Sequence, residues 1–239
     1  MLSAMYRELI PLVKPGVQTI EIDMWVQDWI KKAGGKPAFL GYKNRKKPFP
    51  AAICISINEE VIHGIPSKRR IREGDLVSLD CGIDLNGFIS DQAVSIEAGN
   101  VSKEIKKLNR ATNECLYKGI AAVKAGDRLL QVSRAVEGYI KPFGYGIVKE
   151  YCGHGVGLAL HEDPHVPNSP HGANPKMNNG MVFAIEPMIN SGTADVEILE
   201  DDWTIVTADD RVSAHWEHTV AIFGGKTEVL TESLEQFIL

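Results

Sequence analysis

Long apolar runs are missing from this 239-residue sequence. None approaches the roughly 20 residues that a membrane-spanning helix needs. Charged residues and a proline (Arg7, Glu8, Pro11 and Lys14) interrupt the first segment, so no signal-peptide core fits there. These absences predict a cytoplasmic protein that does not act at a membrane.

Cysteine is scarce and unpaired. The four residues (Cys54, Cys81, Cys115 and Cys152) stand singly, with no C-x-x-C pair, which predicts a reducing compartment without disulfides. The net charge of −5 argues against a specific nucleic-acid partner. Linkers rich in Pro, Gly or Ser and low-complexity segments are also lacking. With 44% apolar residues, the chain is expected to form one domain, 1–239.

Apolar periodicity and turn residues predict alternating helices and strands. A helix is expected to start at Thr19 as its N-cap and to end at Gly34-Gly35, a second runs from Ser102 to Gly126, and a third covers 129–140 before Pro142. Asn86-Gly87 is a hairpin turn. The expected strands are 53–57, 77–83, the return arm up to Ile96, 147–151, 181–190, 203–208 and 213–223.

A loose internal repeat accompanies these elements. An apolar strand with Asp80 precedes one with Asp91, and later a strand with Glu186 precedes one with Glu217. The pattern predicts an α+β domain of two similar halves. Each acid alone would be read as a solvent-facing residue of a strand. Four acids converging would repel one another, and a pair of divalent metal ions would remove that repulsion.

The histidines divide into two groups. His63, His154 and His161 lie in Gly-containing or loop segments beside the strands with the acids, whereas His165, His171 and His215 are expected to be surface or capped residues. The string His161-Glu-Asp-Pro-His165 matches the H-E-x-x-H zinc motif, which requires a helix. Pro164 opposes a helix there, so the zinc-protease reading is rejected.

The acids and His154 match, in order and spacing, the five metal ligands of the methionine aminopeptidases, which this chain resembles. The matching strings include Cys-Ile-Ser-Ile-Asn-Glu (54–59), His-Gly-Ile-Pro (63–66), Ile-Glu-Pro-Met (185–188) and Trp-Glu-His-Thr (216–219). The resemblance runs from about Leu12 to Thr231. It implies the pita-bread (creatinase/aminopeptidase) fold, in which two pseudo-symmetric halves surround a central antiparallel sheet.

The resemblance also implies roles for single residues. Two divalent ions (Co²⁺, Mn²⁺, Fe²⁺ or Zn²⁺) would be held by Asp80, Asp91, His154, Glu186 and Glu217, with Asp91 and Glu217 bridging. Glu186 would transfer a proton, His161 would stabilise the oxyanion, and His63 would hold the substrate amide. The methionine pocket would comprise Phe39, Tyr42, Phe49, Cys54, Leu160 and Trp203. Two features depart from the family: Leu160 replaces an aromatic residue, and loop 43–50 is longer and more basic.

The implied activity is removal of the initiator methionine from nascent chains, with a preference for a small second residue. A monomer is expected. Contact of Lys43, Arg45, Lys46 and Lys47 with the ribosome competes with a simpler interpretation as a solvated loop. One alternative is an Xaa-Pro aminopeptidase or dipeptidase, which usually carries an extra N-terminal domain. Another is a non-catalytic binding relative, in which ligand positions are typically replaced.

Overall fold

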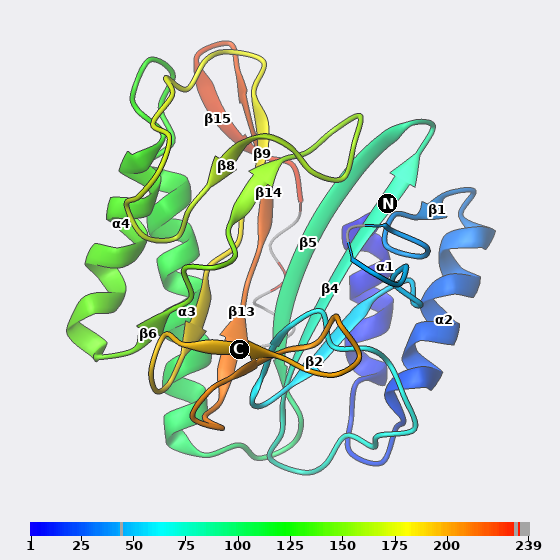
Figure 1. Cartoon of the computed structure of the whole chain (residues 1–239). Coiled ribbons are helices and arrows are strands. Elements are labelled where there is room, and N and C mark those ends of the chain that lie inside the picture. Colours follow the sequence, from blue (N-terminus) through cyan, green and yellow to red (C-terminus); the bar gives the residue numbers. More distant parts are fainter. Residues whose placement is uncertain (44, 232–233, 235–239) are drawn as a thin grey trace.

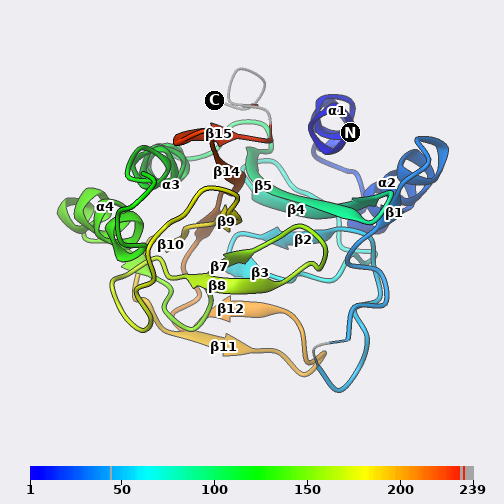
Figure 2. The same ribbon diagram turned by 90° about the horizontal axis from the view of Figure 1, so that it is seen from above.

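The computed structural model describes residues 1–43, 45–231 and 234. Two pairs of helices flank a group of antiparallel strands (Figures 1 and 2), with α1 and α2 on one flank and α3 and α4 on the other. The helices are α1 (Leu2–Leu9), α2 (Thr19–Lys32), α3 (Lys103–Ala121) and α4 (Leu130–Ile140), with 3-10 turns η1 (Ile10–Leu12) and η2 (Lys141–Phe143). This arrangement confirms the predicted α+β class.

The strands form four sheets within the described residues. The first is β1 (Lys36–Pro37), β4 (Leu76–Leu85) and β2 (Cys54–Ile57), with β5 (Phe88–Glu97) also paired to β4. The second is β15 (Lys226–Val229), β14 (His218–Phe223), β9 (Val182–Ile185), β7 (Gly153–Gly155) and β8 (Glu162–Val166). Two small sheets complete the set: β13 (Ser213–His215), β10 (Met188–Asn190) and β6 (Gly146–Ile147); and β11 (Val196–Ile198), β12 (Ile205–Thr207) and β3 (Glu60–Ile62).

The predicted hairpin is the β4–β5 pair. Leu85 pairs with Phe88 across the two-residue turn, in which Asn86 and Gly87 have φ of 57° and 85°. Both values are positive, as a type I′ turn requires. Asp80 pairs with Ala93, and Asp91 with Gly82. Because side chains alternate between the faces of a strand, the two acids lie diagonally across one face.

Two expected long strands are each broken in the second half. The segment 181–190 divides into β9 and β10 at Glu186-Pro187, and 213–223 divides into β13 and β14 at Trp216-Glu217. Pro187 has no N–H to donate to a ladder. Glu217 leaves the β9 ladder and donates its N–H to Ala93 O on β5 at 2.9 Å. The two halves therefore meet where β14 contacts β5, beside the acids.

Several other boundaries differ from the expectations. Gln18, not Thr19, is the N-cap of α2, because its backbone N–H donates to Glu21 Oε2 at 2.8 Å in a capping box. The expected strand 147–151 ends at Ile147, while β12 lies within the expected 203–208. Ser102 caps α3 by accepting from the Ile105 N–H. Helix α1 and strands β1, β3, β7, β8, β11 and β15 were not expected.

Helix α1 is held by packing on the sheet. Its residues Leu2, Met5, Tyr6 and Leu9 are buried. The Tyr6 hydroxyl lies 2.8 Å from Gln92 O and 3.2 Å from Leu79 O, which belong to β5 and β4. The helix thus supports the hairpin that carries Asp80 and Asp91.

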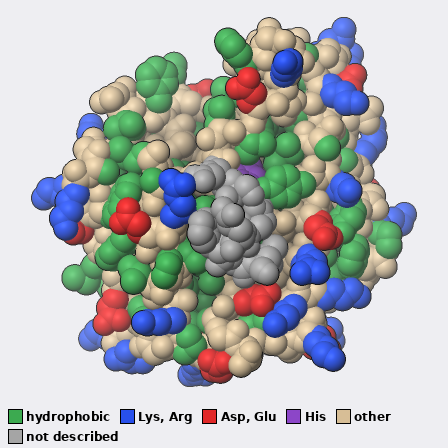
Figure 3. Space-filling view, turned by 180° about the vertical axis from the view of Figure 1, so that it is seen from behind, with side chains coloured by type: hydrophobic (Ala, Val, Ile, Leu, Met, Phe, Trp, Pro, Cys, Tyr) green, Lys and Arg blue, Asp and Glu red, His purple; other side chains and the backbone are tan. Residues whose placement is uncertain are grey.

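The outer surface bears on whether the chain could bind a membrane or a polyanion. No helix in the described part of the chain is long and apolar enough to cross a membrane. On the face shown in Figure 3, Lys and Arg side chains are scattered among acidic and apolar ones. The described part of this face therefore carries no continuous basic patch.

Candidate active site

A cavity of about 350 Å³ lies where the two halves meet, and it gathers every residue that the sequence analysis assigned to the site. The five acidic and imidazole ligand candidates, the two further histidines and the six apolar-pocket residues all line it. They are Asp80, Asp91, His154, Glu186, Glu217, His63, His161, Phe39, Tyr42, Phe49, Cys54, Leu160 and Trp203. Elements far apart in the sequence thus converge on one cavity.

The ligand candidates come from both halves. Asp91, His154 and Glu217 are buried, and each offers one ligand atom within 4.8 Å of those of the other two. His154 Nε2 lies 3.9 Å from Asp91 Oδ2 and 3.4 Å from Glu186 Oε1. His154 Nδ1 is 2.9 Å from its neighbour Gly155 O, which fixes the ring so that Nε2 points toward the acids.

The carboxylates are unfavourably placed without cations. Burial raises the pKa of Asp91 to about 7. Burial, and then the nearby acids, raise the pKa of Asp80, Glu186 and Glu217 well above their usual values. Asp80 Oδ1 and Glu217 Oε1 are buried without a hydrogen-bond partner among the described residues. Unpartnered buried oxygens and a carboxylate-rich set fit divalent metal ions that prefer oxygen ligands.

The His63 loop is held in an unusual backbone conformation. His63 has φ of 59°, and Gly64 accepts from the Ile55 N–H at 2.9 Å and donates to Ser56 Oγ at 3.1 Å. A Cβ at Gly64 would lie 2.2 Å from Ile55 O, so only glycine fits there.

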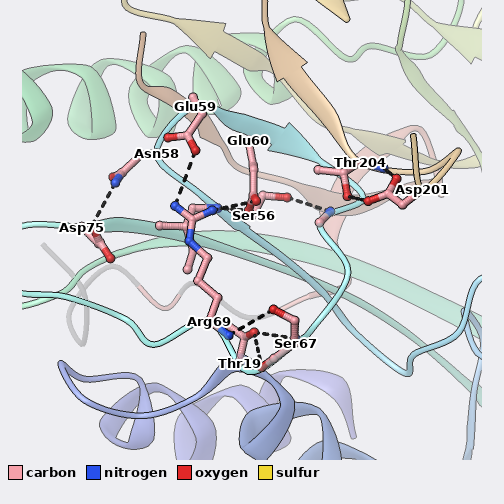
Figure 4. Close-up of polar contacts among 12 residues, drawn as sticks. Thr19, Ser56, Asn58, Glu59, Glu60, Ser67, Arg69, Asp75, Asp201 and Thr204 are labelled. Carbon is pink, nitrogen blue, oxygen red and sulfur yellow. Dashed lines mark hydrogen bonds and ion pairs between the residues drawn. The ribbon is translucent and has the colours of Figure 1, made fainter. Parts of the chain in front are cut away.

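Polar contacts around the β2–β3 turn anchor the same loop (Figure 4). Arg69 donates to Glu60 at 2.7 Å, and Asn58 Nδ2 donates to Asp75 Oδ1 at 2.9 Å. These contacts join the β2–β3 turn to the segment between β3 and β4. They hold His63 at the cavity wall.

His161 lies against His154, with ring centroids 4.2 Å apart. Its Nδ1 is 2.6 Å from the Tyr42 hydroxyl. Burial, and then neighbouring histidines, lower the pKa of His161 to about 3, while burial and Arg45 lower the pKa of His63 to about 4. Both rings are therefore neutral near pH 7, with one N–H each to donate.

The predicted apolar pocket is a distinct cluster. Phe39, Phe49, Cys54, Leu160 and Trp203 are buried together, and Tyr42 packs against them. Phe49 contacts Phe39 and Trp203 edge-on, with centroids 6.5 and 5.2 Å apart. The smaller Leu160 still lines the pocket in place of an aromatic residue.

Two expectations about histidines were wrong or incomplete. His215 is buried, with Nε2 3.5 Å from Glu186 Oε2, although we expected a surface or capped residue. It precedes Glu217 by two positions, so period-two alternation was the available signal. His165 also lines the cavity, whereas His171 does not. The segment 162–166 is strand β8, which supports rejection of the helical zinc motif.

Sequence reasoning also missed several residues of the cavity wall. These are Arg45, Ile62, Glu150, Tyr151 and Cys152. Arg45 was treated only as part of a basic loop. No local pattern in the sequence indicates that its side chain turns inward.

Comparison with known proteins identifies the family. The model of metallopeptidase family M24 matches residues 1–223. The chain belongs to that family. The match begins earlier than the expected Leu12 and thus includes α1.

Individual relatives agree with this membership. The chain is 54% identical over 236 residues to a methionine aminopeptidase from Treponema pallidum, covering 98% of this chain and 91% of the relative. A crystal structure of methionine aminopeptidase from Rickettsia prowazekii is similar, with a TM-score of 0.92, 33% identity, and 96% and 92% of the two chains covered. An Xaa-Pro dipeptidase from Bacillus anthracis, 23% identical with a TM-score of 0.75, shares the fold; the match covers 97% of this chain but 57% of that one.

Proposed function

We propose that this chain is a methionine aminopeptidase that removes the N-terminal methionine from proteins and peptides. The observation that carries the proposal is the single cavity in which buried acids and histidines adjoin an apolar pocket. The high identity to the Treponema pallidum relative over nearly its whole length supports the same substrate class.

Two divalent metal ions would be held by the acids and His154. Asp91 and Glu217, at the junction of the halves, would serve as ligands together with Asp80, His154 and Glu186. The unpartnered oxygens of Asp80 and Glu217 support this assignment. When bound, such ions polarise a scissile carbonyl and lower the pKa of a water to about 7.

The chain's own residues would position the peptide and move protons. Glu186 would carry a proton from the attacking water to the leaving amine, because its carboxylate lines the cavity beside His154. Neutral His161, held by Tyr42, would donate to the oxyanion that develops on the scissile carbonyl. Neutral His63 would hold the amide of the second residue. Glu186 would thus have two tasks, as a metal ligand and as the proton carrier, whereas His161 and His63 would have one each.

The apolar cluster would receive the methionine side chain. An unbranched thioether fits irregular apolar space and makes favourable contacts with aromatic rings. Phe39, Phe49 and Trp203 supply such rings, and Cys54 and Leu160 line the pocket with them. A small second residue is proposed by analogy with the family.

The substrates would be N-termini of nascent proteins in the cytoplasm, and the enzyme would act as a monomer. Lys43, Lys46 and Lys47 are exposed. Their charges support a transient ribosome contact through RNA phosphates.

The test is hydrolysis of Met-Ala-Ser and Ala-Pro-Ala by chelated protein resupplied with Mn²⁺, Fe²⁺ or Co²⁺. Metal-dependent methionine release from the first peptide alone is expected. Cleavage of the proline peptide instead would assign the enzyme to the Xaa-Pro side of the family. Inactivity on both, with no metal retained, would support a non-catalytic relative.

A further inference from the structure

Among the basic residues of loop 43–50 that the structure describes, Arg45 alone lines the cavity. Its guanidinium carbon lies 5.6 Å from the centroid of the Trp203 ring, a cation–π distance. Its Nη2 donates to the Tyr151 hydroxyl at 3.0 Å. The neighbouring Lys43, Lys46 and Lys47 are exposed and do not line the cavity. Arg45 is thus fixed on two aromatic side chains.

The two aromatic residues that hold Arg45 also contact His63. The rings of Tyr151 and Trp203 meet the His63 ring edge-on, with centroids 5.9 and 6.0 Å away. Trp203 in turn packs against Phe49 of the apolar pocket. Arg45 therefore contacts the Trp203 wall of the apolar pocket and the Tyr151 side chain that packs against His63.

The charge of Arg45 adds to the hydrogen bonds from Thr204 and Trp203 that lower the pKa of Asp201, and it remains open to a ligand. Among the described residues, no carboxylate is close enough to Arg45 to form an ion pair. Its hydrogen bond to Tyr151 uses only one of the N–H donors of the guanidinium. A guanidinium presents five N–H donors in a fixed plane and pairs readily with carboxylates. Glu150 is a second charged residue that lines the cavity. Its carboxylate accepts a hydrogen bond from the Lys149 N–H at 3.1 Å.

We propose that Arg45 is a specificity-determining residue that favours peptides with an acidic side chain shortly after the second residue and disfavours basic ones. The inference rests on the proposed function, in which His63 holds the amide of the second residue. A peptide that continues past His63 passes the Trp203–Tyr151 wall. Its next side chains then come within reach of the guanidinium.

The experiment uses amidated peptides Met-Ala-Asp-Ser, Met-Ala-Asn-Ser and Met-Ala-Lys-Ser, so that no terminal carboxylate competes. The metal-reconstituted full chain is assayed for kcat/KM on each. Arg45→Gln should lower the Asp-to-Lys ratio by about fivefold, the effect of one partly exposed ion pair. Arg45→Glu should lower the ratio further. Added salt should move the wild-type ratio toward the value of Arg45→Gln because it screens exposed charges.

Lys46→Glu is the matched control, because it makes the same charge change one residue away on an exposed side chain. This control corrects for the general attraction of a chain of net charge −5 to cationic peptides. The Asp-to-Lys ratio of kcat/KM for Lys46→Glu should stay within about twofold of the wild-type ratio. Equal ratios in wild type, Arg45→Gln and Arg45→Glu would overturn the inference, as would equal shifts in Arg45→Glu and Lys46→Glu. Failure of the proposed function is distinguishable, because wild type would then release no methionine even from the neutral Asn peptide.

Discussion

Two histidine rings in the cavity, those of His161 and His154, are each held by a contact that sets their orientation. The Tyr42 hydroxyl lies at Nδ1 of His161, so that Nε2 is the ring nitrogen that can face a substrate. Gly155 O likewise lies at Nδ1 of His154, so that Nε2 of that ring points toward the acids. Such contacts fix the tautomer and the direction of an imidazole. The site is therefore preorganised at the level of single rings.

Replacement of His161 by Ala should lower kcat by about 10²–10³-fold, the usual effect of removing one oxyanion donor. Metal content should be unchanged, because His161 is outside the proposed ligand set. Tyr42→Phe should lower kcat less, since the ring remains but its hydrogen bond is lost. Steady-state kinetics and metal analysis of both variants test this. Loss of metal from His161→Ala would mean that the residue is a ligand.

Gly64→Ala should reduce the free energy of unfolding by at least about 2 kcal/mol, because the added Cβ would meet Ile55 O at 2.2 Å. The displaced backbone includes His63, so activity should fall as well. Gly138→Ala is the control: it lies within α4, and nothing is within 4 Å of the position that its Cβ would take. That variant should be neutral or more stable by up to about 1 kcal/mol. Denaturant titration gives both values.

At the scale of elements, α1 supports the hairpin that carries two of the acids. Tyr6 is fully buried, and its hydroxyl contacts carbonyls of both β4 and β5. Tyr6→Phe should cost about 1–2 kcal/mol, because buried carbonyls lose a donor. Tyr145→Phe should cost less than about 0.5 kcal/mol, because its hydroxyl has no hydrogen-bond partner among the described residues. Equal denaturation midpoints for the two variants would contradict this role of α1.

Elements with local signals were predictable from the sequence. The β4–β5 hairpin follows from Asn86-Gly87, and α3 follows from its Ser102 cap and apolar stripe. Helix α1 could not be predicted, because eight residues are too few for a stable isolated helix and it depends on burial against the sheet. The break at Glu217 likewise depends on a distant partner, Ala93.

The residues of the candidate site divide in the same way, into those with a signal in the sequence and those whose place depends on distant packing. The ordered acids and histidines identified the cavity through the family resemblance, and all of them line it. His215 was missed because its burial depends on how β13 packs beside β10. Arg45 was missed because the direction of a loop side chain depends on distant Tyr151 and Trp203.

At the scale of the whole molecule, the two halves are joined at the acids, so metal binding should stabilise the entire fold. Asp91 has its pKa raised from 3.8 to about 7 by burial. In metal-free protein this group stabilises the fold fully below the unfolded pKa of 3.8, and that stability is lost as the pH rises through about 7. Metal binding must displace the proton and is therefore favoured at higher pH.

The expected result is that Mn²⁺ raises the Tm of chelated protein more at about pH 7.5 than at about pH 5.5, in one transition for the whole chain. Thermal unfolding with chelator and with excess Mn²⁺ at each pH measures the difference. NaCl at the same ionic strength is the control for salt, because Na⁺ screens charges without the affinity of a divalent ion for carboxylates. If Mn²⁺ raised the Tm more at about pH 5.5 than at about pH 7.5, the result would contradict the protonation of the buried acids.

The junction of β14 with β5 has a consequence for synthesis of the protein. Chains are made from the N-terminus, and Asp80 and Asp91 leave the ribosome long before Glu186 and Glu217. A partly made copy therefore carries the first pair of acids without the second. Such a copy lacks two of the proposed metal ligands, so we expect activity to begin only when β14 has folded against β5.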